Sequence, residues 1–305
     1  GGLGDAAGRH QPQRRHGDVV GRCHCLTHRR HDLVHWGPGA RVELGRQPQR
    51  LCPTSFNGER RHAARANPGV GALDGQLDMP LRAEIISKIL MRQGTMQELQ
   101  GFLNVNDTNY PAGIMSSLLG IDSVPRAIHF AEDTPLWMSP WSSGSDRTWA
   151  SQPTLPMGQN AFERMANAFT LLMTTAGIPI IYYGDEIGLP GAGDPDNRRF
   201  MMWSNLSAGQ TYLRTHLEKL GQVRKTRAAL RRGTRTAVYA SADTMAYKMT
   251  STQPADTVYV AINRGDQQNT VMNLPTGALT NLLDGQTVMG PVVTLAPRAS
   301  MILVQ

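Results

Sequence analysis

The turn within LLGIDSVPRAIHF, residues 118–130, carries side chains that can act on a bound molecule. Asp122 and Ser123 follow a short apolar run, and His129 comes soon after them. Because a carboxylate, a hydroxyl and an imidazole are the groups of a Ser-His-Asp triad, these three are the candidate catalytic residues. A solvated turn is the competing interpretation, since the chain has no Gly-x-Ser-x-Gly nucleophile elbow.

A second group of polar side chains follows the apolar run IPIIYYG, residues 178–184. It consists of Asp185, Glu186, Asp194, Asp196 and Asn197. Oxygen ligands of this kind suit Ca²⁺, so Asp194, Asp196 and Asn197 are candidate ligands, and calcium is the one cofactor suggested. The competing interpretation is a loop that Arg198 and Arg199 hold through ion pairs.

Three tryptophans lie between these two groups, at positions 137, 141 and 149. Spaced aromatic rings in a loop offer flat amphipathic faces on which sugar rings stack. Trp137 and Trp141 are therefore candidate substrate-binding residues. The alternative is a loop that packs on its own aromatic side chains.

Residues 1–70 differ in composition from the rest of the chain. They hold 12 Arg and five acidic residues, a net charge of +7, and no Ile, Met, Tyr or Lys. Such a segment lacks the apolar positions for a core, and its composition resembles a GC-rich gene read out of frame, so it is predicted to be an irregular arm. Because no aromatic residues are interleaved with its arginines to stack on bases, no nucleic-acid partner is predicted for this arm.

The tract CHCLTHRRHDLVH, residues 23–35, is the one part of this arm that resembles a metal site. Its Cys and His residues are able to bind zinc, but their spacing fits no zinc finger. A metal-assisted hydrolase of a small ester or lactone therefore stays open as an alternative function. No signal peptide and no membrane span are expected, and the compartment stays open.

Residues 71–232 alternate between apolar runs and helical patterns, whereas residues 233–305 hold short β-rich runs between polar turns. The runs at 115–121 and 178–184 predict strands, the second one covered on both faces. Residues 81–92, 160–177 and about 209–230 predict helices. The fold class is thus α/β, with parallel βαβ units followed by a small all-β sandwich.

Residues 72–305 resemble the C-terminal half of an alpha-amylase family glycoside hydrolase. LDGQLDMPL resembles the sixth barrel strand, and GIPIIYYGDEIGLPGAGDPDNRRFMMW, residues 177–203, resembles the eighth strand and its loop. The resemblance implies a partial (β/α)8 barrel with a C-terminal β-sandwich, and a site at the carboxyl ends of the strands. It also implies a carbohydrate partner, and an incomplete barrel whose open sheet edges favour homo-oligomers.

The same resemblance makes glycosidase activity doubtful. The family uses a nucleophile and a general acid after strands four and five, and no segment of this chain matches them. Glu59 is the only Glu near the place of the general acid, and its context does not match. The strand-seven pattern Gly-Asn-His-Asp-Val-Pro-Arg reads Gly-Ile-Asp-Ser-Val-Pro-Arg at 120–126, so all three polar residues have changed.

The expected function is therefore a truncated, diverged hydrolase by resemblance, or a non-catalytic carbohydrate-binding remnant. Arg126, Asp185 and Glu186 join the two tryptophans as candidate substrate-binding residues. An ion pair between Arg126 and Asp122 is also expected, because they lie four residues apart around the turn.

Overall fold

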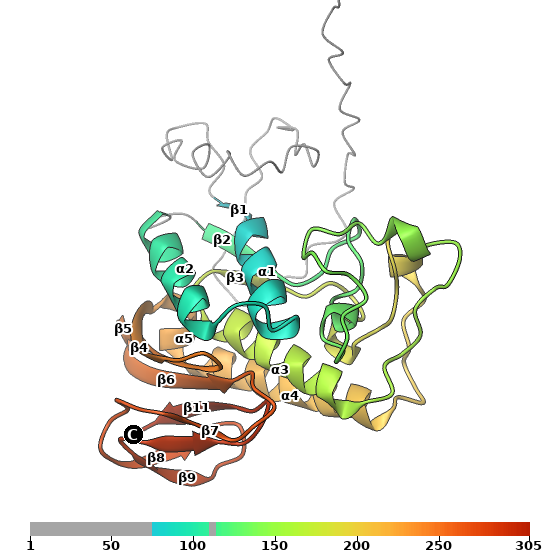
Figure 1. Ribbon diagram of the computed structural model, residues 1–305. Helices are drawn as coiled ribbons and strands as arrows, with labels where there is room; N and C mark the ends of the chain where they lie inside the picture. Colours follow the sequence, from blue (N-terminus) through green and yellow to red (C-terminus); the bar gives the residue numbers. More distant parts are fainter. Residues whose placement is uncertain (1–74, 110–113) are drawn as a thin grey trace, which may run out of the picture. The chain divides into compact units, whose positions relative to one another are not determined.

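The computed structural model describes residues 75–109 and 114–305 (Figure 1). The predicted arm at 1–70, with its His- and Cys-rich tract, lies outside the described residues. The prediction that this arm has an out-of-frame origin concerns the same residues. Among those described, no helix is long and apolar enough to cross a membrane.

Three short parallel strands form the sheet that carries the candidate site. They pair in the order β1-β2-β3, and their bounds are Gly75–Leu77, Ile114–Leu118 and Ile178–Ile180. Helical segments connect them in the sequence, as parallel strands require, because the chain must return to the same end of the sheet between strands. The alternating pattern of the sequence predicts this arrangement.

The helices lie beside this sheet. Those predicted at 81–92 and 160–177 end close to their predicted residues, whereas the one predicted at about 209–230 is divided at Arg227 into two helices. In chain order the helices are α1 (Met79–Ile85), its π-helical continuation η2 (Ile86–Leu90), α2 (Met96–Asn109), α3 (Gln159–Thr174), α4 (Ala208–Thr226) and α5 (Ala228–Arg232). Ser207 caps the N-terminus of α4 and forms a capping box with Gln210. The apolar stripe predicted within 160–177 is buried along α3, where Phe162, Met165 and Phe169 are at most 2% exposed.

The chain from Thr234 onward forms antiparallel sheets. The strands are β4 (Thr234–Ala240), β5 (Thr244–Thr252), β6 (Ala255–Asn263), β7 (Asn269–Val271), β8 (Gly277–Asn281), β9 (Thr287–Gly290), β10 (Val293–Leu295) and β11 (Ser300–Val304). Six of them pair in the order β4-β5-β6-β11-β8-β9, and β10 pairs with β7. The helices pack on the larger sheet (Figure 1), since Phe169 and Leu220 share a buried core with Tyr247 and Ile302.

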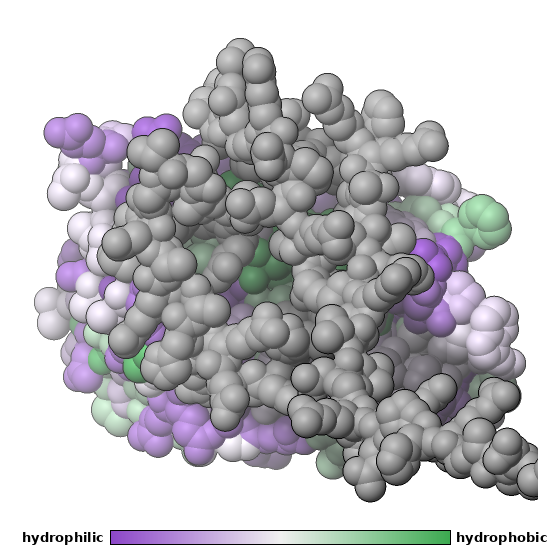
Figure 2. Space-filling view, turned by 90° about the horizontal axis from the view of Figure 1, so that it is seen from above, coloured by the Kyte–Doolittle hydropathy of each residue, from purple (hydrophilic) through white to green (hydrophobic). Residues whose placement is uncertain are grey.

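The apolar run IPIIYYG departs from its prediction. Only Ile178–Ile180 form a strand, all three residues are half-buried, and Ile181 and Tyr183 are both 39% exposed. The strand ends early because Tyr182 and Tyr183 turn to pack their rings on the Arg126 guanidinium, 4.4 and 4.7 Å away. Figure 2 shows hydrophobic surface of the described residues near the middle of the face seen from above.

A half-buried histidine lies where α3, α4 and β11 meet. His216 Nε2 lies 2.9 Å from Thr170 Oγ1, which also lies 2.9 Å from Ser300 Oγ. Burial lowers the pKa of His216 to about 4, and the nearby charge of Lys219 acts in the same direction. The imidazole is therefore neutral at neutral pH.

We expect this histidine to make the protein less stable in mild acid. Between about pH 6.5 and pH 4 the unfolded chain binds a proton at His216 that the folded chain does not, so the free energy of unfolding falls as the pH falls. The loss is at most about 3 kcal/mol. Urea unfolding at pH 7 and pH 4.5 measures it, and the loss should be smaller in His216→Gln. Equal losses in both proteins would contradict the assignment.

Candidate functional site

The turn after β2 and the loop after β3 meet at the carboxyl edge of the parallel sheet. Asn197 Nδ2 donates to the backbone oxygens of Asp122 and Val124, at 2.8 Å each. The backbone N–H of Arg126 donates to Gly191 O at 3.0 Å. These bonds fix the turn against the loop, so two segments that are distant in the sequence form one surface.

Arg126 is buried beneath this surface and does not face a substrate. Its side chain is 1% exposed, and Nε donates to Asn197 O at 2.8 Å. Nη1 donates to Tyr183 O at 2.5 Å and to Asp185 Oδ1 at 3.1 Å. The prediction of Arg126 as a substrate-binding residue and partner of Asp122 is wrong, because the guanidinium turns under the loop after β3.

Asp185 is the partner of that arginine and is also buried, at 2% exposure. A Cβ at position 120 would lie 2.2 Å from Asp185 Oδ2, so only glycine at 120 admits the carboxylate. Burial raises the pKa of Asp185 to about 6, although the Arg126 charge acts in the opposite direction. Asp185 therefore does not line the site as predicted, while Glu186 is half-buried.

The predicted triad does not form. His129 is fully buried, its Nδ1 lies 2.7 Å from Glu132 Oε1, and its Nε2 accepts the Gly191 N–H at 3.1 Å. Because both ring nitrogens have other partners, the imidazole braces the loop and is no base for Ser123. Ser123 itself is exposed and Asp122 is half-buried.

The tryptophans divide between the core and the surface. Trp137 is 6% exposed, its Nε1–H donates to Asp146 Oδ1 at 2.8 Å, and its ring packs on Phe130. The prediction that Trp137 binds substrate is therefore wrong, because the loop packs on this ring. Trp141 and Trp149 are 47% and 82% exposed, so Trp141 remains a candidate for stacking.

The acidic loop after β3 is held by arginines. Asp194 forms an ion pair with Arg198. Asp196 accepts two hydrogen bonds from Arg199, at 2.8 and 2.7 Å, and one from the backbone N–H of Ala192 at 2.7 Å. No group of three or more His, Cys, Asp or Glu suited to a metal ion occurs in the described part of the chain. Two of the predicted calcium ligands, Asp194 and Asp196, are therefore engaged by guanidinium groups, as the competing interpretation expects. The third, Asn197, uses its amide nitrogen to hold the turn after β2.

We expect calcium and chelators to leave the stability of the described fold unchanged. The two loop carboxylates are already neutralised by guanidinium groups, and an ion would have to displace them. Thermal unfolding in about 5 mM Ca²⁺ and, separately, in about 5 mM EDTA should give melting temperatures within about 1 °C of each other. A rise of several degrees with Ca²⁺ that is lost in Asp196→Asn would overturn this assignment.

Tyr182 is a member of the site that the sequence does not single out. Its ring lies 4.4 Å from the Arg126 guanidinium. Burial raises the pKa of Tyr182 to about 12, and the charge of Asp122 acts in the same direction to a smaller extent. The phenol is thus neutral and able to donate a hydrogen bond. The only sequence signal is a pair of tyrosines directly after an apolar strand, which equally fits a buried strand end.

Comparison with known proteins shows which of them this chain is similar to. No protein-family model matches the chain. The chain is 34% identical over 154 residues to neopullulanase 2 of Thermoactinomyces vulgaris, which covers 48% of this chain and 26% of the relative. An alpha-amylase from Geobacillus thermoleovorans, solved with acarbose, is 25% identical with a TM-score of 0.60 over 76% of this chain and 48% of that chain.

A third similarity is to a cyclic alpha-maltosyl-(1→6)-maltose hydrolase from Arthrobacter globiformis, solved with maltose. It is 25% identical with a TM-score of 0.57, over 77% of this chain and 45% of that chain. The chain thus spans about a quarter of the length of the first curated relative and about half of these solved structures. Its C-terminal part is related to the C-terminal half of alpha-amylase family glycoside hydrolases.

Proposed function

We propose that this chain binds α-glucan oligosaccharides at the carboxyl edge of β1-β2-β3 and does not hydrolyse them by itself. The three strands correspond to the last part of a (β/α)8 barrel, and residues 233–305 to the β-sandwich appended to it. The observation that supports the proposal most strongly is the surface made by Asp122, Ser123 and Tyr182, which the buried Arg126–Asp185 pair supports from below.

Binding follows from the polar groups that this surface presents. The described residues offer the Asp122 carboxylate no hydrogen-bond donor or cation within bonding distance, and its backbone oxygen is fixed by Asn197. A carboxylate accepts from sugar hydroxyls, and Ser123 and the neutral Tyr182 phenol donate and accept. Trp141 and Trp149 supply exposed rings in the segment that follows, and Glu186 is proposed at the margin of the same site.

Hydrolysis does not follow, because a glycosidase needs a nucleophile and a general acid on opposite sides of the scissile bond. Of the two carboxyls after β3, Asp185 is buried against Arg126 and Glu186 is half-buried. The serine at 123 has no histidine base, since His129 is engaged elsewhere. The metal-assisted alternative finds no support in the acidic loop, whose carboxylates bind arginines.

Titration calorimetry with maltotriose tests this proposal. Asp122→Asn should raise the Kd by about tenfold or more, which corresponds to one charge-assisted hydrogen bond. The substitution should leave folding intact because the carboxylate has no protein partner among the described residues. Glu218→Gln, on the exposed side of α4, is the matched control and should bind as the wild type does. An unchanged isotherm for Asp122→Asn would refute the proposed site.

A further inference from the structure

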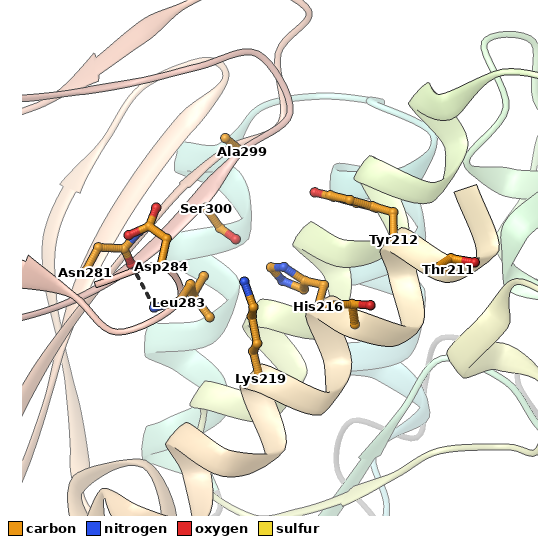
Figure 3. A pocket seen from close by; sticks show the side chains of 10 residues that line it. Thr211, Tyr212, His216, Lys219, Asn281, Leu283, Asp284, Ala299 and Ser300 are labelled. Carbon is orange, nitrogen blue, oxygen red and sulfur yellow. Dashed lines mark hydrogen bonds between the residues drawn. The ribbon is translucent and has the colours of Figure 1, made fainter. Parts of the chain in front are cut away.

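A pocket of about 330 Å³ lies between α4 and the β domain, and none of its lining residues belongs to the candidate site (Figure 3). Tyr212, His216 and Lys219 line it from α4, one helical turn apart, while Asn281, Asp284 and Ser300 line it from β8, the following turn and β11. The volume is at the lower end of the range for small-ligand sites. It suits one compact polar unit.

Asn281 is the best-defined group in this pocket. The residue is 3% exposed, and its Oδ1 accepts the backbone N–H groups of Leu283 at 3.3 Å and Ile302 at 3.1 Å. Because the oxygen is held by two donors, the amide orientation is fixed. Its Nδ2 has no acceptor among the described residues, so a nearly buried side chain offers a preorganised donor to whatever occupies the pocket.

Lys219 and Asp284 supply groups of opposite charge from the two walls of the pocket. Lys219 has no carboxylate partner within the described part of the chain, and its ammonium points into the pocket (Figure 3). Asp284, on the other wall, accepts only the backbone N–H of Gln286 at 2.9 Å. His216 lies next to Lys219 on α4 (Figure 3), with its ring stacked on Tyr212 at 6.2 Å between ring centres and its Nε2 2.9 Å from Thr170 Oγ1.

The balance of these groups restricts the class of ligand. One cationic and one anionic side chain cancel in charge, so an anion such as phosphate would meet the Asp284 carboxylate without a second cation to offset it. Donors and acceptors stand on both walls, and a ligand with several hydroxyl groups matches them because each hydroxyl both donates and accepts at one atom. The Tyr212 ring adds a flat, partly exposed aromatic surface, 38% exposed, on which the C–H face of a sugar packs.

We propose that this pocket is a second carbohydrate site, which binds the terminal pyranose unit of a neutral oligosaccharide. Asn281 and Lys219 donate to its hydroxyls, Asp284 accepts from them, and Tyr212 packs on the ring face. The site goes beyond the proposed function, since it would anchor a glucan chain to the β domain independently of the sheet edge. Its occupation would hold a long glucan chain against the protein at two places.

The test follows the His216 imidazole by ¹H–¹³C NMR in the full-length chain, with maltose as the probe. The signal is assigned by its loss in His216→Gln. Maltose should shift it in a saturable way, and Tyr212→Ala and Lys219→Met should each raise the apparent Kd by about tenfold. Lys225→Met, an exposed lysine on the same helix that does not line the pocket, should titrate as the wild type does.

Several results would overturn the second site. One is a His216 signal that does not shift at high maltose concentration. Another is a titration that is unchanged in both Tyr212→Ala and Lys219→Met. The third is a shift of the signal with inorganic phosphate but not with maltose. Asp122→Asn separates this proposal from the first one, because it should weaken binding at the sheet edge and leave the His216 titration unchanged. Loss of the His216 shift in Asp122→Asn would show that the pocket does not bind sugar independently.

Discussion

Replacing Arg126 with alanine should lower the free energy of unfolding by about 3–5 kcal/mol, which is the usual effect of breaking a buried ion pair from one side. The substitution leaves the Asp185 carboxylate buried without its cation, and it also removes the donor to Tyr183 O and Asn197 O. The turn after β2 and the loop after β3 thereby lose the hydrogen bonds and the ion pair that join them. Urea unfolding at pH 7 measures the change.

Two further variants show whether the buried pair causes that loss. Asp185→Asn combined with Arg126→Ala should be more stable than Arg126→Ala alone, because the unpaired charge is gone. Arg198→Ala, which breaks a half-exposed ion pair in the same loop, should cost less than about 1 kcal/mol. A similar small loss for Arg126→Ala would mean that the pair does not support the site.

The purified 305-residue chain should release no more reducing sugar from starch than a blank without protein. The expected deficit relative to an active glycosidase is many orders of magnitude, because the two-carboxylate mechanism fails when either group is missing. An assay of reducing ends after overnight incubation, run on preparations from a host without amylases, gives the rate.

The control for this second prediction is Glu59→Gln, which removes the only Glu near the place of the general acid. Release of sugar by the wild type that disappears in this variant would show that the chain carries catalytic carboxylates after all. Release that persists equally in both, and in Asp122→Asn, would point to a contaminating enzyme.

The sequence predicts the elements of this fold well because apolar periodicity decides them. The stripe of Phe162, Met165 and Phe169 is buried along α3 as its spacing indicates. The pattern fails at residues 178–184, where Tyr182 and Tyr183 look like strand residues but pack on a guanidinium. A local apolar run does not show whether a ring packs against another strand or against a distant cation.

The sequence predicts the candidate site less well, since burial decides which polar groups are available. Arg126, Asp185 and His129 are polar residues in the segments that follow β2 and β3, which is typical of a functional site, yet each is buried in a structural role. Their partners come from loops that are distant in sequence, such as Gly191 and Asn197. Residue spacing around the turn favours Asp122 as the partner of Arg126, whereas the folded chain brings Asp185 closer.

Self-association through the open edges of the parallel sheet stays a prediction. So do the boundaries at 71–232 and 233–305, since the described residues, 75–109 and 114–305, belong to one compact unit in which the helices and the β domain share a core.

One NMR titration with maltotriose tests the central claim, which is binding at the sheet edge without turnover. Backbone amide signals of residues 121–124 and 181–186 are followed together with the anomeric signals of the sugar in the same tube. We expect saturable shifts of those amides in the wild type, no shifts there in Asp122→Asn, and maltotriose that remains intact after a day. Conversion of maltotriose to shorter sugars by the wild type, or saturation with no shift at the sheet edge, would contradict it.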